Sequence, residues 1–168
     1  MEQTANDVSS IISNGILDAN DNNCCVKNVG DAFAIFHARA PRKGSVAVPG
    51  LKDIEVYCPK EDDSTGWTNI LSPDYTVYEE YYTGVKGETP EYIEEKRSGN
   101  VKRYIEHPIV RITFMRFKDS DCYKFIGIYT LNIEKSIKNN SLVWERATYY
   151  CDLRRVYELM TLLKRYEK

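Results

Sequence analysis

A short segment in the middle of the chain gathers side chains that could recognise a nucleobase. Stacking on a base requires flat aromatic faces, and reading its polar edge requires an amide or a carboxyl group. We take six residues of this segment as a candidate base pocket: Trp67, Asn69, Asp74, Tyr75, Tyr78 and Tyr82. Alternate side chains of a strand enter the core whatever the function, so sheet packing is the competing explanation for about half of these rings.

Charge is segregated along the chain although the formal net charge is only −2. Residues 61–95 hold ten acidic side chains against one lysine, and residues 96–118 hold seven basic ones against one glutamate. Basic groups beside an aromatic pocket could hold the phosphates that flank a bound base. The candidate phosphate contacts are Arg42, Lys43, Lys102, Arg103 and Arg116. Solvated surfaces without a ligand explain the same pattern equally well.

An enzyme is the weaker interpretation of the same residues. Asp74, Glu94 and Lys96 resemble in spacing the two carboxylates and lysine of metal-dependent nucleases, which activate water on Mg²⁺. That chemistry requires Glu94 and Lys96 on one side of a strand, and residues 90–99 lack the apolar alternation of a buried strand. The two histidines, His37 and His107, stand in no catalytic or zinc-binding pattern. We therefore expect no catalytic residue, no metal and no cofactor.

The five cysteines are scattered and odd in number, which predicts free thiols and a reducing, cytoplasmic setting. No stretch approaches eighteen consecutive apolar residues, and the first twenty residues lack the charged start and apolar run of a secretory signal. We expect neither a membrane span nor a signal peptide.

The elements that must position these residues can be expected from periodicity. Residues 5–18 have apolar side chains at helical spacing and predict a helix. Alternation predicts strands over 31–40, 50–58, 67–71 and 75–82. The polar stretch 88–99 predicts a short helix or a mobile loop.

The second half carries the clearest strand pattern. Residues 109–117 and 123–132 alternate on either side of a turn and predict a hairpin, with Gly127 marking a bulge or a close backbone approach. A further strand is expected over 143–150 and an amphipathic helix over 153–166. The 168 residues are thus expected to form a single α+β domain: a mostly antiparallel, barrel-like sheet over about 31–150, flanked by N- and C-terminal helices.

Parts of this pattern resemble a known family. The relevant residues in the second half are Val110-x-Ile112-x-Phe114-x-Arg116, Tyr123-x-Phe125-x-Gly127-x-Tyr129-x-Leu131, Trp144-x-Arg146 and Cys151-Asp152-Leu153, and upstream of them Trp67-x-Asn69-x-Leu71-Ser72-x-Asp74 with Tyr78 and Tyr82. The pattern is similar to the PUA-like, SRA-like modules attached to modification-dependent HNH restriction endonucleases. The resemblance spans roughly residues 31–153.

The resemblance implies a small pseudo-barrel that accepts a flipped, often modified base in an aromatic pocket. The sequence has no HNH cassette, so the resemblance implies a stand-alone, non-catalytic reader, with DNA favoured over RNA as the ligand and a protein partner supplying any catalytic activity. A protein-interaction module remains the alternative function, in which the acidic, tyrosine-rich segment 61–95 docks a basic partner. Convergence of the candidate phosphate contacts around an aromatic cleft would favour nucleic acid, and scatter would favour the interaction module.

Overall fold

The computed structural model describes residues 5–41, 43–61, 66–81 and 88–164. Its helices are α1 (Val8–Asn14), α2 (Val29–Ile35), α3 (Pro90–Glu106), α4 (Ile133–Asn139) and α5 (Leu153–Lys164). Its strands are β1 (Ile16–Asp18), β2 (Cys25–Val26), β3 (Ser45–Val48), β4 (Leu51–Tyr57), β5 (Trp67–Leu71), β6 (Val77–Tyr81), β7 (Val110–Met115), β8 (Tyr123–Leu131), β9 (Leu142–Thr148) and β10 (Tyr150–Asp152).

One large sheet organises the molecule. Its strands follow the order β3-β4-β7-β8-β9-β6-β5, and β2 adds to β8 beside this path. Every neighbouring pair is antiparallel except β4 and β7. The sheet curls, because side chains of β4 and β5 meet although these strands are not neighbours in it. The expected α+β fold with a mostly antiparallel, curled sheet is confirmed.

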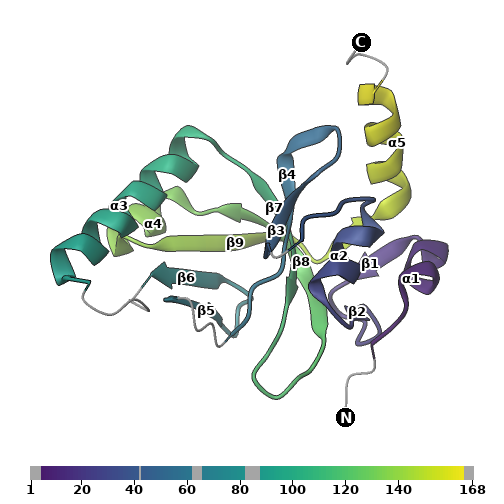
Figure 1. Cartoon of the computed structure of the whole chain (residues 1–168), viewed down its shortest axis with the longest axis horizontal. Helices are drawn as coiled ribbons and strands as arrows, with labels where there is room; N and C mark the ends of the chain where they lie inside the picture. Colours follow the sequence, from purple (N-terminus) through teal and green to yellow (C-terminus); the bar gives the residue numbers. More distant parts are fainter. Residues whose placement is uncertain (1–4, 42, 62–65, 82–87, 165–168) are drawn as a thin grey trace.

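Apolar side chains fill both faces of the central strand β7. Ile112 and Phe114 belong to one core cluster, which includes residues of α1, α2 and α5. Met115 belongs to a second cluster, together with Val101 of α3 and Trp144 of β9. Figure 1 shows the same division, with α3 and α4 at one end of the molecule and α1, α2 and α5 at the other. The first and last helices therefore share one end of the sheet.

The predicted strand over residues 31–40 is wrong, because this segment begins inside the helix α2. The side chain of Asn28 caps that helix by accepting from the amide of Asp31 at 2.8 Å. Residues Ala32, Phe33 and Ile35 are buried, a pattern that a short helix and a strand can both produce. The helix α4, capped by Asn132, was not predicted at all.

The other predicted elements are found, with shifted ends. The first helix is shorter than residues 5–18, because Gly15 adopts φ 77° and ends it before β1. The polar stretch 88–99 forms the start of α3, which begins with Thr89 as its cap and Pro90 in its first turn. The hairpin β7–β8 is confirmed, as is the closing helix.

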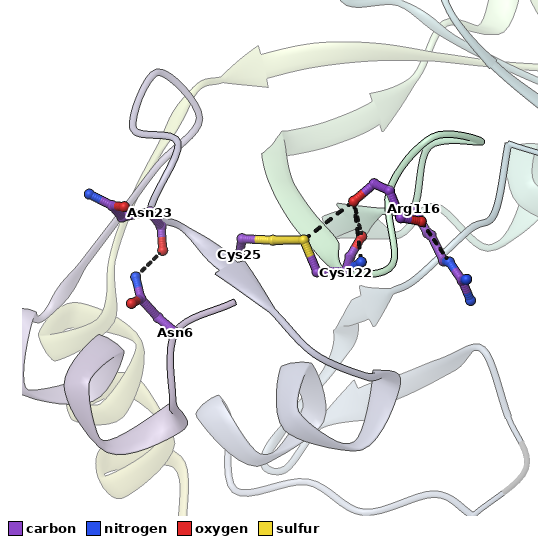
Figure 2. Close-up of a disulfide and its surroundings, with 6 residues drawn as sticks. Asn6, Asn23, Cys25, Arg116 and Cys122 are labelled. Atoms are coloured by element: carbon purple, nitrogen blue, oxygen red, sulfur yellow. Dashed lines mark hydrogen bonds between the residues drawn. A yellow bond between two sulfur atoms is a disulfide. The ribbon is translucent and has the colours of Figure 1, made fainter. Parts of the chain in front are cut away.

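A disulfide joins Cys25 to Cys122, 97 residues apart (Figure 2). The prediction of free thiols is therefore wrong for this pair, and it holds for Cys24, Cys58 and Cys151, which are buried and unbonded. Antiparallel pairing of β2 with β8 places Val26 opposite Tyr123, and this pairing brings the two cysteines together. The sequence separation of the pair left no local pattern from which to predict the bond.

Candidate nucleic-acid interface

The hairpin of β5 and β6 places an amide opposite a carboxylate in the interior. Asn69 and Glu79 are direct partners in the strand register, and their exposed fractions are 1% and 5%. Trp67, two residues before Asn69, shares its face of β5 and is partly buried. Two of the residues expected from the sequence, Trp67 and Asn69, are therefore brought together, with Glu79 added to them.

Tyr57 reaches this pair from β4. Its hydroxyl lies 3.1 Å from Oδ1 of Asn69 and 2.5 Å from Oε2 of Glu79. The amide of Asn69 also donates to the carbonyl of Lys60 at 3.3 Å. Asn69 is thus held from two sides in one orientation.

A buried arginine completes the polar interior. Arg111 of β7 donates through Nε to Glu55 at 2.8 Å, through Nη1 to Glu79 at 2.9 Å and through Nη2 to the hydroxyl of Tyr104 at 3.0 Å. Its guanidinium carbon lies 3.9 Å from the centre of the Tyr57 ring and 4.0 Å from that of Trp144. The side chain that makes these three hydrogen bonds and two stacking contacts is only 4% exposed.

The titration of these groups follows from their burial and from each other's charge. Burial, and then the charge of Glu79, raise the pKa of the Tyr57 phenol well above its ordinary value, so the hydroxyl stays protonated and donates. Burial acts to lower the pKa of Arg111, but the charges around it, with Glu79 foremost, outweigh that effect and the net pKa is raised. The guanidinium is therefore charged at any pH at which the protein is folded.

Trp67 also contacts a second aromatic ring, that of Tyr81 on β6. The rings of Trp67 and Tyr81 meet edge to face with their centres 5.2 Å apart, and Nζ of Lys96 lies 4.0 Å from the centre of the Tyr81 ring. Arg97 binds Glu80 at 2.6 Å and donates to the carbonyl of Tyr81. Cations of α3 therefore border the aromatic side of the hairpin.

Residues 10–153 match the model of the SRA, or SET and RING associated, domain. The chain belongs to the SRA domain family. The sequence matches no curated protein closely enough to be counted as a relative.

A solved structure shares the fold of this SRA domain. It is described as the 5-hydroxymethylcytosine-specific restriction enzyme AbaSI, and it superposes with a TM-score of 0.67 at 21% identity. The match covers 87% of this chain and 45% of that protein, so this chain spans less than half of the enzyme's length. At this identity the likeness shows a shared fold.

The SRA domain places the other expected pocket residues elsewhere. Asp74 and Tyr75 lie in the turn between β5 and β6, where Asp74 accepts from Ser72 and from the amide of Thr76. Tyr75 has φ 66° and stacks under Arg146, whose guanidinium carbon is 3.9 Å from the ring centre. Tyr78 lies on β6 beside Glu79 and so faces the opposite side of the sheet. Tyr82 lies outside the described residues.

The expected phosphate contacts are spread over three segments. Lys43 lies in the loop before β3, and Arg116 lies in the loop after β7, where its Nε donates to the carbonyl of Ser120 at 3.1 Å. Lys102 and Arg103 lie on α3, and Lys102 borders a cleft of about 310 Å³ between α3 and α4. Arg42 lies outside the described residues. Among the described residues these contacts do not converge on one cleft, and this scatter by itself favours the interaction module over nucleic acid.

A different cation lies next to the pair of Asn69 and Glu79. The backbone of Arg116 pairs with that of Lys60, whose carbonyl holds Asn69. Lys60 is exposed and was not among the expected residues. The sequence offers no signal for it, because the pairing of residue 60 with residue 116 extends the parallel contact of β4 with β7.

The arrangement required by a metal-dependent nuclease is not formed. Glu94 and Lys96 lie on the helix α3 and not on a strand, and Asp74 lies in the β5–β6 turn. Within the described part of the chain, no group of three His, Cys, Asp or Glu side chains is placed to hold a metal ion. No described helix has both the length and the apolar character needed to cross a membrane.

Sequence reasoning missed Glu79, Tyr57 and Arg111. Glu79 could have been found, because the turn between β5 and β6 sets the register that places it opposite Asn69. Arg111 gave a partial signal, because Arg111 and Arg116 lie on opposite faces of the predicted strand 109–117 and at least one of them must face the core. Its partners, like those of Tyr57, depend on how the sheet curls.

Proposed function

We propose that this SRA domain is a non-catalytic reader of DNA that takes a flipped, modified base into a pocket formed by Trp67, Asn69, Glu79 and Tyr57. The observation that carries the proposal is the buried pair of Asn69 and Glu79 between two partly buried rings, Tyr57 on β4 and Trp67 on β5. A buried amide beside a buried carboxylate is costly unless both are bonded, and such pairs are common at binding sites.

The two groups complement the edge of a base. Tyr57 and Arg111 both bind Oε2 of Glu79, and we assign Oε1 to the ligand as an acceptor. Asn69 uses one amide hydrogen for Lys60, and we assign the other to the ligand as a donor. An adjacent acceptor and donor fit the adjacent donor and acceptor of a Watson–Crick edge, while Trp67 or Tyr57 stacks on the ring at about 1–3 kcal/mol per base.

We take the base to be a modified cytosine, in line with the SRA family and with the 5-hydroxymethylcytosine named for AbaSI. DNA is favoured over RNA for the same reason. A cytoplasmic location stays part of the proposal, because a reader must meet its DNA.

Phosphate contacts follow from the cations around this pocket. We assign Lys60 and Arg116 to the strand on one side of it, together with Lys43, which precedes β3 where that strand pairs with the end of β4. Arg42 is proposed as a further phosphate contact from the sequence alone. Lys102 and Arg103 of α3 are assigned to more distant phosphates. Such contacts add affinity for any sequence, and they make it depend on salt.

The reader is proposed to act without chemistry of its own. AbaSI is more than twice as long as the segment that this chain matches, so an enzyme of this kind has room for a second unit. We propose that a protein partner supplies any cleavage that follows recognition. The site residues proposed here are assigned to binding and orienting a base.

A binding screen tests the proposal. Short duplexes with cytosine, 5-methylcytosine or 5-hydroxymethylcytosine, and the same strands unpaired, are titrated with the protein at two salt concentrations. We expect a preference for one modified duplex that persists at both salts. If the wild-type protein binds none of them at low salt, the reader proposal is rejected. The alternative function, a protein-interaction module with an acidic, tyrosine-rich surface, is then adopted.

A further inference from the structure

Arg111 is the centre of the polar interior, and it contacts groups from four elements. Glu55 and Tyr57 face it from β4, Glu79 from β6, Tyr104 from α3 and Trp144 from β9. The exposed fractions of the Arg111 and Glu79 side chains are 4% and 6%. These contacts fix the guanidinium in its plane, with Tyr57 and Trp144 stacked on it.

Only arginine can make this set of contacts. Its planar fork donates from three nitrogens in fixed directions, whereas a lysine ammonium is a compact charge without a flat face for stacking. Here Nε, Nη1 and Nη2 each bind a different group, two carboxylates and one phenol. The guanidinium also binds both the partly exposed carboxylate of Glu55 and the buried carboxylate of Glu79, and its charge offsets their like charges.

We propose that Arg111 is a positioning residue of the base pocket, which orients the Glu79 carboxylate as a hydrogen-bond acceptor for the base and holds the ring of Tyr57 by stacking on it. The inference rests on the proposed function, and it assigns Arg111 no contact with DNA. Arg111 and the hydroxyl of Tyr57 both bind Oε2, so they leave Oε1 in a set direction.

Loss of the guanidinium changes what Glu79 can do. A buried carboxylate that stands near a second, partly exposed one and has lost its cation favours protonation. A protonated Glu79 offers a hydroxyl donor where the base requires an acceptor, so recognition is lost at low pH and returns as the pH rises. A residue that only filled space would, when removed, weaken binding equally at every pH.

The experiment compares Arg111→Met with wild type and with Arg154→Met. The control removes the same charge from an exposed pair with Asp152 at 3.7 Å. The readout is the ratio of the affinity for the preferred duplex to the affinity for the unmodified duplex. It is measured from about pH 5.5 to about pH 8.5, roughly the range in which a buried carboxyl can titrate. We expect Arg111→Met to lower the ratio by about tenfold or more at the acid end and less at the alkaline end. The control should leave it unchanged. The inference is overturned if Arg111→Met keeps the wild-type affinity ratio at every pH. It is also overturned if the variant lowers the ratio by the same factor at every pH.

Thermal unfolding supplies a readout that needs no DNA. A carboxyl that is protonated more readily in the folded than in the unfolded state stabilises the fold at low pH, and this contribution is lost as the pH rises. The loss of Tm in Arg111→Met relative to wild type should therefore be larger at alkaline than at acid pH, and an equal loss overturns the inference even if no duplex binds. If wild type binds no duplex, the proposed function fails separately.

A second variant covers the case in which Arg111→Met does not fold. Arg111→Lys keeps the charge between the carboxylates but loses the fork and the stacking face. We expect a lowered affinity for the preferred duplex and an unchanged affinity for the unmodified one, because Glu79 is no longer aligned while no phosphate contact is lost. A wild-type ratio in this variant contradicts the positioning role.

Discussion

The hydroxyl of Tyr57 lies 3.1 Å from Oδ1 of Asn69 and links β4 to β5. These strands are separated in the sheet by β7, β8, β9 and β6, so the bond joins two distant parts of the sheet across its concave face. The same hydroxyl reaches Glu79 of β6. One phenol therefore ties the curvature of the sheet to the orientation of the proposed base-reading groups.

Tyr57→Phe should destabilise the fold by about 1–3 kcal/mol, because buried oxygens of Asn69 and Glu79 lose a donor. Urea unfolding measures the change. The exposed Tyr149 offers a control, and Tyr149→Phe should shift stability by no more than about 0.5 kcal/mol. Equal stability of Tyr57→Phe and wild type would show that the phenol contributes only its ring.

Trp67→Ala should abolish the preference for the modified duplex while leaving the salt dependence of binding nearly unchanged. Loss of a stacking face costs about 1–3 kcal/mol per base, but it removes no phosphate contact. Titrations at several salt concentrations separate the two effects, with Tyr149→Ala as the aromatic control. A preserved preference would remove Trp67 from the pocket.

Lys60→Ala and Arg116→Ala should weaken binding to all duplexes alike. Each lost phosphate contact flattens the slope of log affinity against log salt by about one unit. Arg154→Ala, an exposed charge on α5, should leave the slope as it is. A change in the preference between duplexes, with an unchanged slope, would place Lys60 or Arg116 at the base instead of the backbone.

Gly127→Ala should destabilise the fold by about 2–4 kcal/mol, because the position has φ 137° and an added Cβ would lie 2.8 Å from the carbonyl oxygen of Thr148. Gly99→Ala is the matched control. An added Cβ there meets nothing within 4 Å, and alanine favours the helix α3 by about 1 kcal/mol. Thermal or urea unfolding should show Gly127→Ala to be less stable than wild type and Gly99→Ala to be more stable. Similar stabilities of the two variants would contradict the crowded backbone at Gly127.

The free thiols should be unreactive in the folded protein. Burial raises the pKa of Cys24 and Cys58, and raises that of Cys151 to about 12, so very little thiolate exists near neutral pH. Iodoacetamide should modify none of them natively at pH 8, should modify three cysteines after unfolding, and should modify five only after reduction of the bond between Cys25 and Cys122. Five modified cysteines without a reductant would contradict the disulfide.

Local patterns in the sequence were enough for most elements of the fold. Alternation predicted the hairpin of β7 and β8, and helical spacing predicted α5, because both patterns depend on which faces of a single element are apolar. The same pattern failed at α2, where buried Phe33 and Ile35 fit a strand as well as a helix and the cap at Asn28 decided the outcome. The local signals for α4, a cap at Asn132 and an asparagine at its end, Asn140, went unused.

The site divides in the same way. Trp67 and Asn69 could be selected from their types and their shared face of one strand, because two residues apart means the same side of a sheet. Glu79 comes from the next strand, where the β5–β6 register places it opposite Asn69. Tyr57 and Arg111 come from β4 and β7, and they reach this pair only because the sheet curls until β4 faces β5. Residue types within one strand are set by the sequence, whereas contacts between distant strands are set by the curvature and register of the whole sheet.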